Sequence, residues 1–302
     1  MAERVSGPDG WTGLSVDVPP PPRPAQIDRL STVLAPLSRI TAPLAIGINR
    51  IPDRGALFVG NHTILGLFDV PFMMRELWLR RGILPRGLGD HAHYALPLWR
   101  DLLESGGMVR GTRENVRELM RRGEHVLVYP GGADEVMKGR GQRYRLLWKQ
   151  RLGFAQLAIE FGYPIVPFSA VGGDDMFDVI ADRETPGLAQ ASKLAERVTG
   201  RPLPPLVAGV GPTLIPRPER LYFSFGEPIE TEGFHGRHDD DQAARELRDQ
   251  VRDAVSTGID ELLELRADDP GRSLRRRLRG GLDGDGGTGS QTDRADYRSA
   301  PR

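Results

Sequence analysis

The sequence of 302 residues contains no cysteine. This absence excludes disulfide bridges, thiolate metal sites and any acyl-cysteine intermediate, and it fits a reducing compartment. The 41 basic and 41 acidic residues give a net charge near zero, which argues against a general nucleic-acid-binding protein. Gly-x-Ser-x-Gly and the P-loop are also absent, so the serine-hydrolase elbow and the P-loop type of nucleotide site are excluded.

Long hydrophobic segments are missing as well. The first ten residues lack the apolar core of a signal peptide, and no uncharged run of 18 apolar residues occurs. We therefore expect a cytoplasmic protein without a membrane-spanning helix.

The remaining composition predicts one α/β domain between two irregular ends. Residues 1–27 are rich in proline and are expected to form a disordered lead-in with a polyproline stretch. Residues 28–270 alternate strand and helix patterns, including an amphipathic helix over 242–266, which predicts helices packed on a sheet. Residues 271–302 are first basic and then rich in Gly and Asp, so we expect a disordered tail.

His62 is the first candidate for chemistry. An apolar run over residues 56–59 predicts a short strand that stops at Gly60, and His62 follows two residues later. Asp69 then precedes an apolar pattern with helical spacing, so His62 lies between a strand end and a helix. Open α/β sheets carry their chemistry at this position, and histidine is the usual general base near neutral pH. An ordinary loop histidine also fits the pattern.

Two further stretches place functional side chains after glycines. Thr112 is a good helix N-cap, and it is followed by Arg113 and Glu114. An arginine there binds a phosphate or carboxylate bidentately, or is simply exposed on a surface helix. A strand over 125–129 runs into Pro-Gly-Gly-Ala-Asp-Glu at 130–135, where paired glycines let the backbone approach an anion. An ordinary strand-to-loop turn is the alternative. A fourth stretch, 165–172, reads as a buried strand at an edge or bulge, because it contains Pro167.

In this order, the four stretches resemble the sequence blocks of the phospholipid/glycerol acyltransferase superfamily over about residues 57–172. Six residues separate His62 from Asp69 where the family pattern has four, and Gly132 stands where phospholipid-making members have glutamate. Both features resemble the branch of the diacylglycerol-acyltransferase-like proteins and the acyltransferase part of phytyl ester synthases. Asp134 stands where that branch often has a basic residue. The resemblance implies a single-domain mixed sheet flanked by helices.

The resemblance implies an O-acyltransferase. It would move a fatty acyl group from acyl-CoA or an acyl carrier to a lipid hydroxyl, with His62 as general base, direct attack, and Asp69 steadying the imidazolium. Neither a metal nor a cofactor beyond the co-substrate acyl-CoA is implied. The acceptor suggested by this branch is a neutral lipid alcohol such as diacylglycerol or a long-chain alcohol. The substrate-binding residues carried over by position are Asn61, Arg113, Glu114, Pro130, Gly131, Gly132 and Glu135.

Several alternatives stay open. The chain could be a lysophospholipid or glycerol-phosphate acyltransferase, a hydrolase that activates water, or a catalytically weak lipid-binding homologue. Asp69 could cap the following helix, hold His62, or do both, and we favour the dual role. His91 and His93 are too few for a zinc site. The oligomeric state cannot be derived.

A lipid substrate without a spanning helix predicts peripheral binding to a membrane surface. Residues 30–48 show apolar side chains at helical spacing interrupted by Pro36 and Pro43, and residues 272–279 carry five arginines. Both segments are candidate membrane contacts, although 30–48 also fits a hairpin packed on the core.

Overall fold

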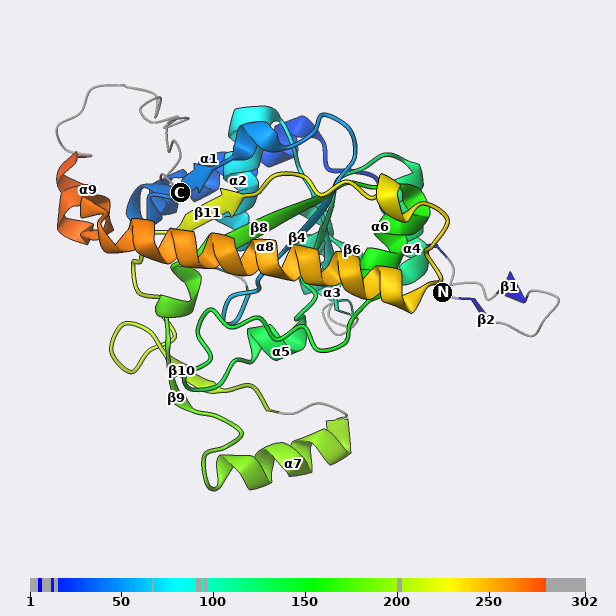
Figure 1. Ribbon diagram of the computed structural model, residues 1–302. Coiled ribbons are helices and arrows are strands. Elements are labelled where there is room, and N and C mark those ends of the chain that lie inside the picture. The colour runs from blue at the N-terminus through cyan, green and yellow to red at the C-terminus, as the bar shows by residue number, and fades with distance from the viewer. Residues whose placement is uncertain are drawn as a thin grey trace, which may run out of the picture.

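The computed structural model describes residues 5–6, 12–13, 16–66, 68–90, 94, 97–199 and 203–280. Its centre is a seven-stranded sheet in the order β3-β11-β8-β4-β7-β5-β6 (Figure 1). The strands are β3 (Leu44–Ile46), β4 (Leu57–Gly60), β5 (Arg86–Gly89), β6 (Val109–Arg110), β7 (Val126–Val128), β8 (Ile165–Val171) and β11 (Tyr222–Phe225). Strands β8, β4, β7, β5 and β6 run parallel, whereas β11 is antiparallel to β8 and parallel to β3. The predicted mixed α/β sheet is confirmed.

Helices cover both faces of this sheet (Figure 1). The helices of the described chain are α1 (Pro24–Thr41), α2 (Val70–Arg81), α3 (Pro97–Ser105), α4 (Arg113–Arg121), α5 (Ala133–Val136), α6 (Gly153–Phe161), α7 (Leu188–Thr199), α8 (Asp241–Ala267) and α9 (Leu274–Gly280). Leu57 and Val59 of β4 pack in a core with α4, α6 and α8, and Phe58 packs in a second core with α2. Alternate side chains of a strand point to opposite faces, so β4 is buried on both sides.

Pro167 lies inside the sheet rather than at its edge. Strand β8 pairs with β11 on one side and with β4 on the other, so the predicted edge position is wrong. The Pro167 carbonyl accepts a hydrogen bond from Gly226 N at 2.8 Å, just beyond the last residue of β11. The nitrogen of Pro167 points the same way, toward the end of the ladder, so the missing N–H disrupts little pairing.

Residues 178–215 leave the sheet after β8 and return before β11. Strands β9 (Asp178–Ala181) and β10 (Leu206–Ala208) form an antiparallel pair, and α7 lies between them in the sequence. In Figure 1 this excursion extends away from the main sheet. The sequence alone predicts a helix around residues 190–198, which forms part of α7, but it does not predict the two short strands.

Residues 17–19, ahead of the first long helix, contact the domain. Asp17 N donates to Asn115 Oδ1 at 2.8 Å, and the Arg86 guanidinium donates to the Pro19 carbonyl at 2.8 Å. Helix α1 begins at Pro24, continues through Pro36 and ends at Thr41. A second short strand pair, β1 (Val5–Ser6) with β2 (Thr12–Gly13), precedes it. The disordered tail was predicted over residues 271–302; residues 274–280 of it form α9, and residues 281–302 lie outside the described residues.

Candidate active site

The candidate site lies at the carboxyl ends of β4, β7 and β8. The chain enters β7 on one side of β4 and then crosses to β8 on its other side. Loops that leave the sheet at such a point diverge and open a crevice for chemistry. The loop after β4 carries His62, the loop after β7 carries Glu135, and the loop after β8 carries Asp174. His62 therefore stands where the sequence predicted it.

Packing fixes the plane of the His62 imidazole. The ring stacks on Tyr129, with centroids 4.1 Å apart and planes inclined by 23°. On the loop side, a Cβ added at Gly66 would overlap the imidazole, and Gly66 has a φ of +58°. Burial raises the pKa of the Tyr129 hydroxyl, and the nearby Asp69 and Glu135 charges act in the same direction. The tyrosine therefore stays neutral and serves as a stacking surface.

Buried side chains hold the backbone of the His62 loop. His62 N donates to Glu135 Oε2 at 2.8 Å, and Lys138 Nζ donates to the His62 carbonyl at 2.8 Å. Asn61 is fully buried, and its amide donates to the Ala170 carbonyl and accepts from Ala170 N. Both polar atoms of Asn61 are thereby bonded to β8. We correct its expected role in substrate binding to one of holding the loop on the sheet.

Asp69 is buried and bonded within the same loop. Its side chain is 3% exposed, and its Oδ1 accepts a hydrogen bond from Thr63 Oγ1 at 2.9 Å. Burial raises the pKa of Asp69 from its ordinary 3.8 to about 6, and the charge of Asp174 acts in the same direction. Asp69 precedes α2, but its backbone is already helical and its side chain makes no capping hydrogen bond. The expected cap is therefore wrong, because the carboxylate turns inward toward Thr63.

The paired glycines make room for protein side chains. A Cβ at Gly131 would overlap the side chain of Glu135. Gly132 has φ +50° and ψ −135°, a conformation that favours glycine, and its N–H donates to the Tyr129 carbonyl at 3.0 Å. Arg151 lies against Gly132 and donates to the Pro130 carbonyl at 2.9 Å. At Pro130 and Gly132, where contacts with an anion were expected, the backbone groups are therefore bonded to other groups of the protein.

Glu135 is fully buried at the start of the short helix α5. Besides His62 N, it accepts a hydrogen bond from Leu147 N at 2.9 Å. Burial raises the pKa of Glu135, and its hydrogen bonds with the His62 and Leu147 amides and the charge of Lys138 oppose that rise. Its expected role in substrate binding is corrected in the same way as that of Asn61: Glu135 orients the His62 peptide.

Arg113 and Glu114 lie elsewhere on the same sheet edge. Thr112 caps α4 as predicted, since its Oγ1 accepts from Asn115 N at 3.1 Å. Strand β6, which leads into α4, is three strands from β4, or about 14 Å at ~4.8 Å per strand. Arg113 is exposed and donates to Gln156 of α6. The structure therefore does not bring this pair against His62.

Tyr129, Lys138 and Asp174 were not identified from the sequence. Lys138 opens a basic stretch, 138–151, whose sequence predicts a solvated loop or a contact with the phosphates of an acyl carrier, yet Lys138 is fully buried. Asp174 follows a predicted strand directly, so the rule that identified His62 would also have identified it. Among the described residues, no cluster of three or more His, Asp or Glu side chains could hold a metal ion. His91 and His93 lie outside them.

Known proteins that are similar in sequence include acyltransferases and related lipid enzymes, in agreement with the fold. Residues 45–171 match the family model described as Acyltransferase. "Phytyl ester synthase 2, chloroplastic" of Arabidopsis thaliana is 35% identical over 248 residues, covering 76% of this chain and 35% of that protein. "DGAT1/2-independent enzyme synthesizing storage lipids" of Mus musculus is 26% identical over 223 residues, covering 71% of this chain and 58% of that protein. The chain thus spans between about a third and three-fifths of these relatives.

A solved structure gives the same fold. The 1-acyl-sn-glycerophosphate acyltransferase PlsC of Thermotoga maritima matches with a TM-score of 0.52 and 18% identity, covering 79% of each chain. At that identity the match shows the fold alone. The family model and the relatives show that this chain belongs to the acyltransferase family that its four sequence blocks resemble.

Proposed function

We propose that this protein is an O-acyltransferase that transfers a fatty acyl group from a thioester to a lipid hydroxyl, with His62 as general base. The observation that carries the proposal is an imidazole held between Tyr129 and Gly66 at the crossover point of the sheet. The names of the relatives, phytyl ester synthase and storage-lipid enzyme, support the reaction class.

The reaction needs one proton acceptor and no acyl-enzyme. His62 takes the proton of the acceptor hydroxyl while the hydroxyl oxygen attacks the carbonyl carbon of the thioester. The C–S bond then breaks, and the imidazolium returns the proton to the leaving thiolate. The Asp69 carboxylate, buried in the same loop, would steady the imidazolium. A positioned general base raises the rate of such a step by about 10²–10⁴-fold.

Substitution of the base tests the mechanism. We expect His62→Ala to lower turnover by about 10²-fold or more, with a small change in the unfolding midpoint. His238→Ala is the matched control, because His238 is an exposed histidine paired with Asp239 on the surface. Wild-type turnover in His62→Ala would remove this residue from the mechanism. Release of free fatty acid without ester in the wild-type protein would indicate a hydrolase.

A neutral lipid alcohol is the acceptor that we propose. The support is the Gly131-Gly132 pair and the printed names of the relatives, one for phytyl esters and one for storage lipids. The assay offers labelled acyl-CoA, or the same chain on acyl carrier protein, with diacylglycerol, long-chain alcohols or lysophosphatidic acid. A clear preference for lysophosphatidic acid would contradict the proposed acceptor, and the two donor arms identify the carrier.

We also propose that the protein binds a membrane surface through α1 and α9. Arg277 of α9 joins the two helices by donating to the carbonyl of Ile40, the residue before the end of α1. Val33 is 73% exposed, Leu37 52% and Leu278 50%. Arg272, Arg275, Arg276 and Arg279 are exposed beside them. Residues 44–46 of the segment expected to contact lipid form strand β3 instead.

Vesicle co-sedimentation tests this surface. Among the described residues, no helix has the length and apolar character needed to span a bilayer. Each arginine near an anionic surface contributes about 1 kcal/mol, so binding should increase with anionic lipid and fall with salt. Val33→Ser/Leu37→Ser should weaken binding at every salt concentration. Binding that ignores lipid charge, salt and both substitutions would contradict the proposed surface.

A further inference from the structure

Lys138 and Asp174 form a fully buried ion pair beside the candidate site. Lys138 Nζ lies 3.1 Å from Asp174 Oδ2 and 2.8 Å from the His62 carbonyl. Asp174 Oδ1 accepts a hydrogen bond from Ile64 N at 2.7 Å. The pair therefore holds a carbonyl and an N–H on the two sides of Thr63. Neither side chain is exposed, so neither is available to touch a substrate.

Stability alone does not explain this arrangement. A buried ion pair loses much of its attraction to desolvation, and replacing the pair by apolar side chains often leaves a protein as stable or more stable. Two further buried carboxyl groups, Asp69 and Glu135, lie close enough to Asp174 for its charge to raise their pKa values, so burying charge is costly here. What the pair provides is a fixed position for the loop that carries His62.

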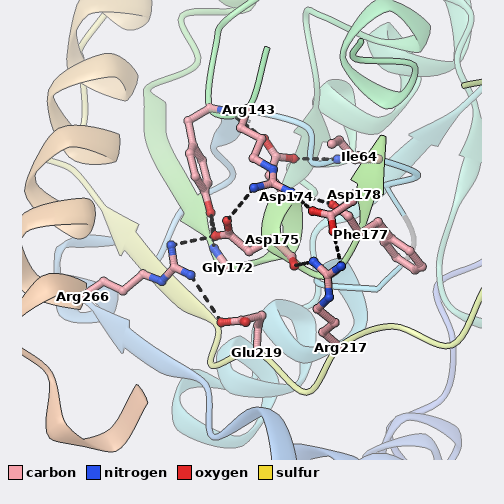
Figure 2. Close-up of polar contacts among 11 residues, drawn as sticks. Ile64, Arg143, Gly172, Asp174, Asp175, Phe177, Asp178, Arg217, Glu219 and Arg266 are labelled. Carbon is pink, nitrogen blue, oxygen red and sulfur yellow. Dashed lines mark hydrogen bonds and ion pairs between the residues drawn. The ribbon is translucent and has the colours of Figure 1, made fainter. Parts of the chain in front are cut away.

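The rest of the fold fixes Asp174 in turn. Its Oδ2 also accepts a hydrogen bond from Tyr144 N at 2.7 Å. The next residue, Asp175, accepts from the Tyr144 hydroxyl and forms an ion pair of 2.6 Å with Arg266 at the end of α8. Figure 2 shows these contacts around Asp174 and Asp175, with Arg143 and Arg266 approaching from different segments. The anchor of the His62 loop thus extends to the long helix α8.

We propose that Lys138 and Asp174 are positioning residues for acyl transfer. They hold the His62 carbonyl and the Ile64 N–H, and through them the imidazole, at the carboxyl end of β4. The proposal rests on His62 as the general base. Displacing a catalytic group by about 1 Å lowers the rate about 10²-fold, so a loosened loop should affect kcat far more than KM.

The first test replaces the lysine. In Lys138→Met we expect kcat to fall about 10–100-fold, while KM for acyl-CoA changes less than about threefold. The matched control is Arg86→Met, because Arg86 is also buried and pairs with Glu124 at 2.6 Å, but at the amino end of β5. This control should lose stability and keep kcat within about twofold of the wild-type value. A folded Lys138→Met with wild-type kcat would overturn the proposal.

A double variant separates positioning from stability. Lys138→Met/Asp174→Asn removes both charges, so no carboxylate is left buried without its lysine. We expect its unfolding midpoint to exceed that of Lys138→Met, while kcat stays low because the His62 carbonyl is still unheld. Recovery of kcat together with stability would assign the pair a structural role only. A double variant that fails to fold while Arg86→Met folds would do the same.

A readout independent of activity separates this proposal from the proposed function. Amide hydrogen exchange over residues 61–65 should accelerate in Lys138→Met and stay unchanged in Arg86→Met, since only the first loses a contact with this loop. Unchanged exchange in Lys138→Met overturns the positioning role even where transfer is normal. Faster exchange in a protein whose His62→Ala variant keeps full turnover shows instead that His62 is not the base.

Discussion

Replacing Asp69 by asparagine should stabilise the protein at neutral pH. The buried Asp69 carboxyl has its pKa raised from 3.8 to about 6, so the folded state binds this proton more tightly than the unfolded state. The stability linked to this group is therefore present below pH ~4 and is lost as pH rises through about 6. About 2.2 pKa units at ~1.4 kcal/mol each give about 3 kcal/mol as the free energy lost above pH 6.

Asparagine has almost the same shape and carries no charge to desolvate. Its Oδ1 can still accept the hydrogen bond from Thr63 Oγ1. We therefore expect the free energy of unfolding of Asp69→Asn to exceed that of the wild type by about 3 kcal/mol at pH 8. Near pH 4, where the wild-type carboxyl is protonated, the two proteins should be almost equally stable.

Urea denaturation of both proteins at half-unit steps from pH 4 to 8 measures this difference, and groups that titrate alike in both proteins cancel. A difference that does not change with pH, or a variant less stable than the wild type at pH 8, would refute the reasoning from burial. Turnover measured on the same samples should fall about 10²-fold or more, because the imidazolium loses its countercharge. Normal turnover would mean that another group orients His62.

Two further substitutions test the surroundings of His62, and a third tests Arg113 as a residue that binds the acyl donor. Gly66→Ala should lower kcat more than about tenfold, because the added Cβ would displace the imidazole. The control is Gly82→Ala, which is also at positive φ but has open space around it, and which should lose only about 1 kcal/mol of stability. Gly131→Ala should lose about 1–3 kcal/mol and most turnover, since its Cβ would displace Glu135; normal melting and turnover would contradict this. Arg113→Gln should raise KM for acyl-CoA and leave kcat unchanged; an unchanged KM removes Arg113 from the donor site.

Local signals explain what could be predicted. An apolar strand that stops at a glycine and is followed by His62 can be recognised without knowledge of distant residues. The same is true of the helix expected at 242–266, which α8 matches almost end to end because its apolar period is long and regular. The strand ending at residue 128 and the cap at Thr112 are equally local.

Long-range contacts explain what could not be predicted. The sequence predicts that Lys138, in a basic stretch, is exposed, because lysine is almost never fully buried without a partner. Its partner Asp174 is 36 residues away, on the other side of β4. The three residues of β3 lie within the helical pattern predicted over 30–48, because so short an edge strand shows no apolar periodicity of its own. From the sequence, Asn61 was predicted to bind substrate, because only the structure shows that both polar atoms of the Asn61 side chain are bonded to Ala170.

The separate anchoring of His62 and Asp69 bears on the number of residues between them. Asn61 is bonded to β8 and the His62 carbonyl to the buried ion pair, whereas Asp69 is bonded to Thr63 and lies at the start of α2. Between these anchors the chain turns through Leu65 and Gly66, both at positive φ. The backbone at His62 is therefore held by groups outside the segment that joins it to Asp69. A change of chain length after Gly66 can alter the spacing of the motif while Gly66 keeps its place beside the imidazole.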